Sequence, residues 1–234
     1  MKTGWKRLSI TAVLAALLGV MALSTVALAQ GPAGSGNLDG DVVVGELSEL
    51  EIEGLLYMRE EEKLARDVYL TFAEEWDLRI FGSIANSEQK HMDAIARLLE
   101  RYDLEDPAET TDIGGFANPT LQELYGELVE AGSGSLADAL MVGATIEEID
   151  ILDLEEYILQ TDEPDIQRVY QSLLRGSGNH LRAFVSALAG ETGEAYQPRY
   201  LSQESFEAIM GSSPQPGGRR SPGTRGGNGR GRGR

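Results

Sequence analysis

Two histidines and a small set of glutamates and aspartates hold the chemistry that this sequence offers. The chain of 234 residues contains no cysteine, which excludes disulfide frameworks, Cys-ligated zinc, iron–sulfur clusters and thiolate catalysis. His91 follows Glu88 at the i+3 position, and His180 is the second imidazole. Because carboxylates and imidazoles are ligand types that first-row metal ions prefer, we expect a metal site.

Four predicted helices must position these ligands. Apolar residues recur at steps of three and four over about 50–75, 80–101, 135–160 and 164–190. The same apolar faces carry polar residues near their middles: Glu62, Glu88, His91, Glu147, Asp150 and His180. An unpaired buried carboxylate costs several kcal/mol, so these inward residues need a compensating cation. Four carboxylates and two imidazoles match the ligands of a di-iron or di-manganese carboxylate site.

The order of these elements predicts an all-α fold. The first two long helices are separated by a short Trp76-Asp77 turn and should be antiparallel, whereas about 34 residues, including a short helix near 120–131, precede the third. Ser135 is the expected N-cap of the third helix, and Pro164 begins the fourth. A single long crossover between the second and third long helices is the ferritin-like antiparallel four-helix bundle arrangement, although an up-and-down bundle also fits the periodicity.

Each of these residues also has an ordinary structural interpretation. The run Glu60-Glu61-Glu62 fits a solvated helix face, and one inward histidine fits a hydrogen-bonded core residue. Tyr69, on the face of Glu62, is either a core tyrosine with its hydroxyl at the rim or a hydrogen-bond donor or redox partner at the site. What favours the metal site is the matching depth of such residues on four helices.

The two ends of the chain differ from its middle. Residues 1–29 have a basic start, an apolar stretch and Ala27-Leu28-Ala29, which is the order of a secretory signal with cleavage after Ala29. The alternative is an uncleaved membrane anchor. Residues 30–48 are a Gly-rich linker, 49–210 are the foldable domain, and 211–234 are an Arg/Gly-rich tail that cannot form a core. We therefore expect an exported, extracytoplasmic protein.

The charge distribution bears on the partners. The net charge is −18, but nine of the 20 basic residues lie in the two ends, so 11 basic residues face 38 acidic ones in the middle, a balance of −27. A body this acidic argues against specific nucleic-acid binding and for cations as partners. The cationic tail suits an anionic surface or polymer, single-stranded nucleic acid, or the protein's own acidic body.

Several segments resemble a known family. YMREEEKLARDVYLTF (57–72) and the SEQKH run (87–91) resemble the first two helices of the ferritin-like, rubrerythrin-like di-iron superfamily. More closely, these segments together with VGATIEEIDILDL, GSGNHLRAF and YLSQESFEAIM are similar in order to the DUF2202 family, over about residues 55–210. One position departs from the superfamily pattern: Ser177 stands where a second Glu-x-x-His has its glutamate, and Asp150 or Glu148 would have to replace that carboxylate.

The resemblance implies an activity and a cofactor. It implies two iron ions, with manganese or zinc as alternatives, acting with O2 or peroxide in ferroxidase, oxidase or peroxidase chemistry. The competing hypothesis is a non-catalytic site that is structural or sequesters a divalent ion, in a domain tethered by its tail. Iron storage would require a cage of many subunits, and a homodimer is compatible with either of the first two hypotheses. Gly176 and Gly178 each weaken the fourth helix by roughly 1 kcal/mol, a cost expected where the backbone approaches a ligand closely.

Overall fold

The computed structural model describes residues 46–109 and 112–212, and in this part of the chain all regular secondary structure is helical. The expected all-α class is therefore confirmed. The predicted signal peptide, most of the linker and nearly all of the Arg/Gly-rich tail lie outside the described residues. Among the helices that are described, none combines the length and apolar character needed to cross a membrane.

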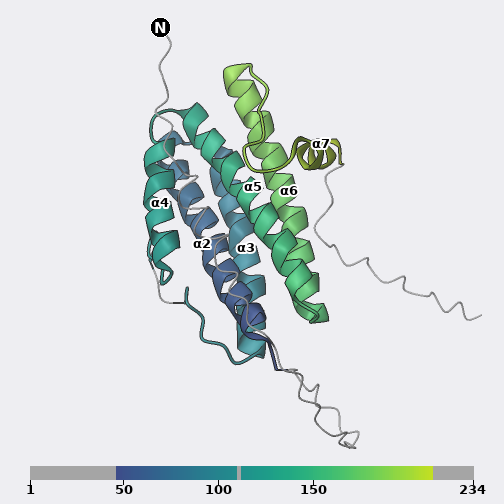
Figure 1. The fold of residues 1–234 in the computed structure, drawn as a ribbon. Coiled ribbons are helices and arrows are strands. Elements are labelled where there is room, and N and C mark those ends of the chain that lie inside the picture. Colours follow the sequence, from purple (N-terminus) through teal and green to yellow (C-terminus); the bar gives the residue numbers. More distant parts are fainter. Residues whose placement is uncertain (1–45, 110–111, 213–234) are drawn as a thin grey trace, which may run out of the picture.

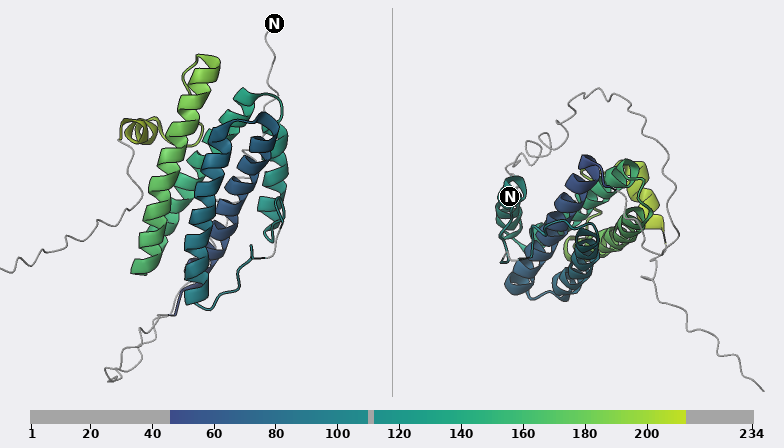
Figure 2. Two further views of the ribbon diagram at one scale, coloured as in Figure 1. Left: turned by 180° about the vertical axis from the view of Figure 1, so that it is seen from behind. Right: turned by 90° about the horizontal axis from the view of Figure 1, so that it is seen from below.

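Four long helices run side by side and are joined in two pairs (Figures 1 and 2). They are α2 (Glu49–Trp76), α3 (Arg79–Arg101), α5 (Leu136–Gln160) and α6 (Pro164–Thr192). The most extensive packing is between α2 and α3 and between α5 and α6, and the two pairs meet where α2 packs on α5 and α3 on α6. The predicted positions of all four helices are confirmed, with ends within two residues of those expected.

Local sequence signals fix where these helices begin. Ser48 and Glu51 form a capping box at the start of α2, and the Ser135 hydroxyl accepts a hydrogen bond from the amide of Asp138, as expected for an N-cap. Pro164 stands in the first turn of α6, where its missing N–H has no intrahelical partner to lose. The turn after α2 places Asp77 in the left-handed region, with φ of 47°.

A charged stretch of α2 holds the crossover that leads to the short helix α4 (Pro119–Gly132). Arg59 forms a bidentate ion pair with Asp106, and the Glu60 carboxylate accepts hydrogen bonds from two consecutive crossover amides. Buried Lys63 pairs with buried Asp67, and each also hydrogen-bonds the crossover backbone. The crossover covers Glu60, while α3 and α5 pack on the other sides of α2, so Glu60, Glu61 and Glu62 are all buried. The interpretation of this run as a solvated face is therefore wrong.

Two apolar clusters lie along the length of the four helices. One includes Phe72, Phe81 and Phe184, and the other includes Met58, Ile95 and Leu173. On α2, Glu62 lies one turn after Met58 of the second cluster and one turn before Ala65 of the first. The fold therefore places a buried polar layer between two apolar layers.

A short helix, α7 (Gln203–Gly211), follows α6 and was not expected from the sequence. It lies across α6 (Figure 1), where the Arg182 guanidinium donates to the carbonyl of Ile209. Its position depends on the segment 196–201, which Glu148 of α5 holds through its carboxylate.

Candidate metal centre

The six predicted ligands meet in the buried polar layer. Glu62 comes from α2, Glu88 and His91 from α3, Glu147 and Asp150 from α5, and His180 from α6. Five of the six are buried, and the His91 side chain keeps only 12% of its surface exposed. Glu62 and His180, which are 118 positions apart in the sequence, thus belong to the same buried layer.

Glu88 lies at the centre of this cluster. One of its carboxylate oxygens, Oε2, is 2.8 Å from Nδ1 of His91, and the other, Oε1, is 2.8 Å from Nδ1 of His180. Glu62 Oε2 is 3.1 Å from the same nitrogen of His91, and Glu147 Oε2 is 3.5 Å from that of His180. Donor atoms of Glu88, His91 and His180 all lie within 4.8 Å of one another, which is compatible with a shared cation.

Several of these atoms are buried without a hydrogen-bond partner. Glu88 Oε1 and His180 Nδ1 are 2.8 Å apart but are not aligned as a hydrogen bond, and Glu62 Oε1 and Asp150 Oδ1 likewise lack partners. A buried polar atom without a partner costs free energy, and one charged costs more. The donor set therefore fits a metal ion, which would satisfy these atoms together.

The pKa values show how the ion-free protein accommodates this charge. Burial raises the pKa of Glu62 to about 7 in spite of the opposing effect of His91, and burial together with neighbouring carboxylates also raises the pKa of Glu147 and Asp150. Burial alone would lower the pKa of His180, but Glu88 and Glu147 outweigh it and raise that pKa to about 10. The raised pKa values of these groups favour their protonated forms when no metal is bound, and metal binding would release those protons.

The outer nitrogens of the two histidines have different surroundings. Nε2 of His180 is 3.0 Å from the hydroxyl oxygen of Ser87, an arrangement that leaves Nδ1 facing the carboxylates. The His91 ring lies against Gly176, where an added Cβ would be 2.5 Å from Nε2. The two rings stack with centroids 5.5 Å apart. The expected close approach of α6 to a ligand thus exists at Gly176, whereas Gly178 faces α7 at an ordinary distance from Ile209.

Tyr69 is a hydrogen-bond donor to the cluster. Its hydroxyl is 2.6 Å from Oε1 of Glu147, and its side chain is completely buried against Phe184. The alternative of a tyrosine whose hydroxyl lies at the rim is therefore wrong. The hydroxyl fixes one Glu147 oxygen and leaves the other facing His180.

The structure separates the two candidates for the carboxylate missing at Ser177. Asp150 is buried, its Oδ1 has no hydrogen-bond partner, and Glu62 and Glu147 are among the charged groups that act on it, so it lies beside the cluster. Glu148 instead accepts hydrogen bonds from the Tyr196 hydroxyl and from three consecutive backbone amides, those of residues 199–201. Of the two, Asp150 is the one beside the predicted ligands.

Three polar neighbours of the cluster were not singled out from the sequence. Ser87 contacts His180, and the acidic groups Asp153 and Asp150 both act on the charge of buried Glu61. Ser87 directly precedes a ligand, but its contact partner is 93 positions away and gives no local signal. Glu61 was hidden in the acidic run of α2.

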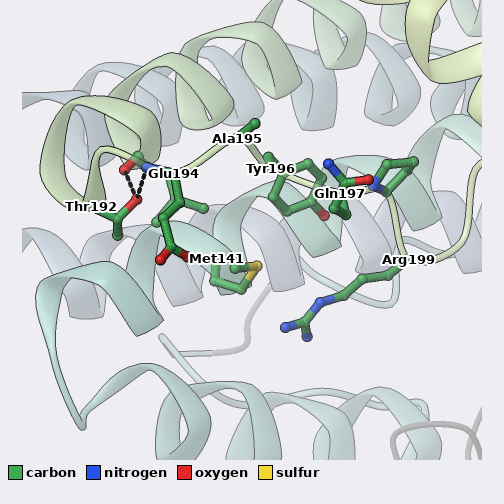
Figure 3. A pocket seen from close by; sticks show the side chains of 9 residues that line it. Met141, Thr192, Glu194, Ala195, Tyr196, Gln197 and Arg199 are labelled. Atoms are coloured by element: carbon green, nitrogen blue, oxygen red, sulfur yellow. Dashed lines mark hydrogen bonds between the residues drawn. The ribbon is translucent and has the colours of Figure 1, made fainter.

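Two surface pockets lie apart from this cluster. One, of about 360 Å³, is lined by Met141, Leu188, Thr192 and residues 194–199 (Figure 3). The other, of about 490 Å³, lies between the start of α2 and the end of α3. Neither pocket is lined by any of the six predicted ligands, so neither provides a substrate cavity at the cluster.

Comparison with known proteins gives one consistent result. The family profile described as "Uncharacterized protein domain (DUF2202)" matches residues 51–213. The uncharacterized protein MJ0754 of Methanocaldococcus jannaschii is 55% identical over 171 residues, which are 73% of this chain and 92% of the relative. The crystal structure of hypothetical protein MJ0754 from Methanococcus jannaschii aligns with a TM-score of 0.72 at 53% identity, over 75% of this chain and 99% of the other.

Proposed function

The chain belongs to the DUF2202 family, and we propose that it is an exported metal-binding protein with a ferritin-like four-helix arrangement and a dinuclear, carboxylate/histidine di-iron site. The six ligands are Glu62, Glu88, His91, Glu147, Asp150 and His180. Two tightly packed helix pairs, joined through a long crossover, support the ferritin-like arrangement.

One observation carries the proposal of a metal site. Four carboxylates and two imidazoles from four helices share one buried layer. Glu62 Oε1 and Asp150 Oδ1 have no hydrogen-bond partner there, and Glu88 Oε1 and His180 Nδ1 face only each other, as an ion pair without hydrogen-bond alignment. A layer that served packing alone would be expected to satisfy these atoms internally. Its composition of hard oxygen and borderline nitrogen donors suits iron or manganese, with zinc as the next candidate.

When bound, a pair of ferrous ions supplies two electrons to O2 or peroxide, which makes iron oxidation or peroxide reduction the proposed activity. The residues of the chain prepare the site for this chemistry. Tyr69 donates to Glu147 and orients its carboxylate, and Ser87 holds the ring of His180. Aromatic and aliphatic side chains such as Phe184 and Ala144 are completely buried beside the layer, which keeps bulk water from it.

A second function is favoured by the spacing of the donors. The closest donor set contains only Glu88, His91 and His180, which is enough for one ion. A single tightly held ion would act structurally or be sequestered, without oxidising anything. Equal metal binding with no turnover of O2 or peroxide would support this function over the redox one.

Metal content of the purified full chain tests the proposal. After anaerobic loading with Fe²⁺, the wild-type protein should retain two ions, and both Glu62→Ala and His180→Ala should lose metal because they remove ligands from opposite helices. Glu155→Ala, at an exposed position of α5, is the matched control and should retain both ions. Fewer than one tightly bound ion in the wild-type protein would contradict the proposal, and one ion would favour the second function.

Export and surface attachment are separate parts of the proposal, supported by the sequence of the two ends. N-terminal sequencing of the protein from its native cells should begin at Gln30, directly after the expected cleavage point. Deletion of residues 211–234 should release the domain from an anionic surface if the tail is its tether. Recovery of the full N-terminus would indicate an anchor instead of a cleaved signal.

A further inference from the structure

A pair of acidic side chains lies beside the six ligands, between α2 and α5. Glu61 is 4% exposed, and the groups that act on its charge include the neighbouring Asp153, which also acts on the Tyr57 hydroxyl. The charged groups that act on Glu61 are all acidic, namely Asp153, Asp150 and Glu62. Its other oxygen, Oε2, is buried without a hydrogen-bond partner. This pair is therefore an uncompensated acidic site within the helix interface.

The pair connects the outside of the molecule with the predicted ligands. Asp153 is partly exposed, Glu61 is buried behind it, and Asp150 is buried one turn before Asp153 on the same face of α5. On α2, Glu61 directly precedes Glu62. The acidic side chains thus form a continuous series that begins at a solvent-accessible carboxylate and ends at two predicted ligands.

A purely structural role explains this arrangement less well. Burying the Glu61 carboxylate, which has an unpartnered Oε2, among the acidic side chains of Asp153 and Asp150 costs free energy that packing alone does not require. An apolar pair would fill the same interface without that cost. The unpartnered oxygens of Glu61 and Asp150 both belong to this series, and both are available to a cation.

We propose that Asp153 and Glu61 are successive steps of a loading route through which a hydrated divalent cation passes between α2 and α5 to Glu62 and Asp150. This inference rests on the proposed metal site and adds the way in which the site is filled. Carboxylate oxygens suit the role because hard divalent cations exchange between them and water ligands. The other partly exposed residue of the site is His91, and approach along its ring is the competing route.

Loading kinetics separate the route from the site. Metal-free full-length protein is mixed with Co²⁺ in a stopped-flow instrument, and the visible absorption of bound Co²⁺ reports filling without any oxidant. Asp153→Asn and Glu61→Gln keep the shape of each side chain and remove its charge. Because charged groups along a path raise association rates by roughly 10- to 1,000-fold, we expect the initial loading rate to fall at least about tenfold in each variant.

The final amount of bound Co²⁺ should stay at the wild-type value in both variants, since neither residue is a ligand. Asp153→Glu should restore most of the rate, and Glu155→Gln, which removes an exposed charge two positions along α5, should load normally. If Glu61→Gln does not fold, Asp153→Asn is sufficient for the test, because Asp153 is partly exposed and its substitution is better tolerated.

Three outcomes would overturn this inference or its premise. A wild-type loading rate in Asp153→Asn and Glu61→Gln means that cations enter elsewhere. A reduced stoichiometry or equilibrium affinity in either variant means that the residue is a ligand and not a step of the route. If the wild-type protein binds no Co²⁺, the proposed metal site itself is wrong. This result differs from the other two, in which the wild-type protein still binds the ion.

Discussion

Gly176 provides the most direct test of how the fold positions a ligand. This residue lies in α6, and a Cβ added to it would be 2.5 Å from Nε2 and 2.6 Å from Cε1 of His91. Ordinary van der Waals contacts lie near about 3.5 Å, so Gly176→Ala requires the ring to move by about 1 Å. Metal–ligand distances tolerate about 0.2 Å. The substitution should therefore displace His91 from its position without altering any proposed ligand.

The expected effect on stability opposes the usual trend. Replacement of glycine by alanine within a helix normally stabilises by up to about 1 kcal/mol. Gly190, also within α6, has no atom within 4 Å of its added Cβ, and Gly190→Ala should show that gain. At Gly176 the clash cancels the gain, and we expect a loss of about 1–3 kcal/mol, the range for overpacking.

Two measurements on the same protein samples check this reasoning. Urea unfolding of the metal-free protein gives the stability of each variant, and titration with Co²⁺ or Fe²⁺ under anaerobic conditions gives the affinity. Gly176→Ala should lower metal affinity by about 10- to 100-fold or more, the effect of disturbing a ligand's support. Gly190→Ala should leave the affinity unchanged. If Gly176→Ala binds metal with wild-type affinity, then His91 is not a ligand whose position depends on its contact with Gly176.

Three further predictions address other parts of the site. The pKa of Glu62 is raised above its ordinary value of 4.5 to about 7 and that of His180 above 6.5 to about 10, so the folded metal-free protein holds protons that the unfolded chain releases. With metal removed by EDTA, the free energy of unfolding should consequently fall as the pH rises from about 5 to 10. Metal affinity should rise over pH 7–10. A thermal unfolding temperature that does not change with pH would contradict this. Tyr69→Phe removes the donor to Glu147 and should weaken metal binding by about tenfold or more, as measured by Co²⁺ titration, and an unchanged affinity would assign the hydroxyl to packing alone. Glu148→Gln should cost at least about 2 kcal/mol of unfolding free energy and expose the 196–211 segment to hydrogen exchange while metal binding persists, and loss of metal would instead connect Glu148 with the site.

Helical periodicity was sufficient to predict much of this structure. Each long helix has one apolar face, and a residue such as His180 could be assigned to that face from its neighbours at three and four positions. Intrahelical geometry also favoured Asp150, which is three residues from Glu147 and on the same side. Predictions that depended only on one helix therefore agreed with the helix bounds and with the burial of these side chains.

Predictions failed where a side chain's surroundings came from distant segments. Three consecutive residues of a helix point in directions about 100° apart, so Glu60, Glu61 and Glu62 can all be buried only if the helix is covered on several sides. The cover comes from α3, α4, α5 and the crossover, whose position no pattern within α2 records. Helix α7 was missed for a related reason, because it is short and its support includes the buried carboxylate of Glu148.

The buried charges of the described residues explain why this protein's interior needs either protons or cations. Eight acidic side chains are buried, against two permanently cationic ones, Arg59 and Lys63. Lys63 and backbone amides satisfy three of the acids, namely Glu60, Asp67 and Glu148. The five that remain are Glu61, Glu62, Glu88, Glu147 and Asp150, and all five lie on the three helices around the two histidines. Two imidazolium groups cannot neutralise five carboxylates, so the layer must take up either protons or metal ions. The pH dependence of metal binding measures the competition between protons and metal ions for these carboxylates.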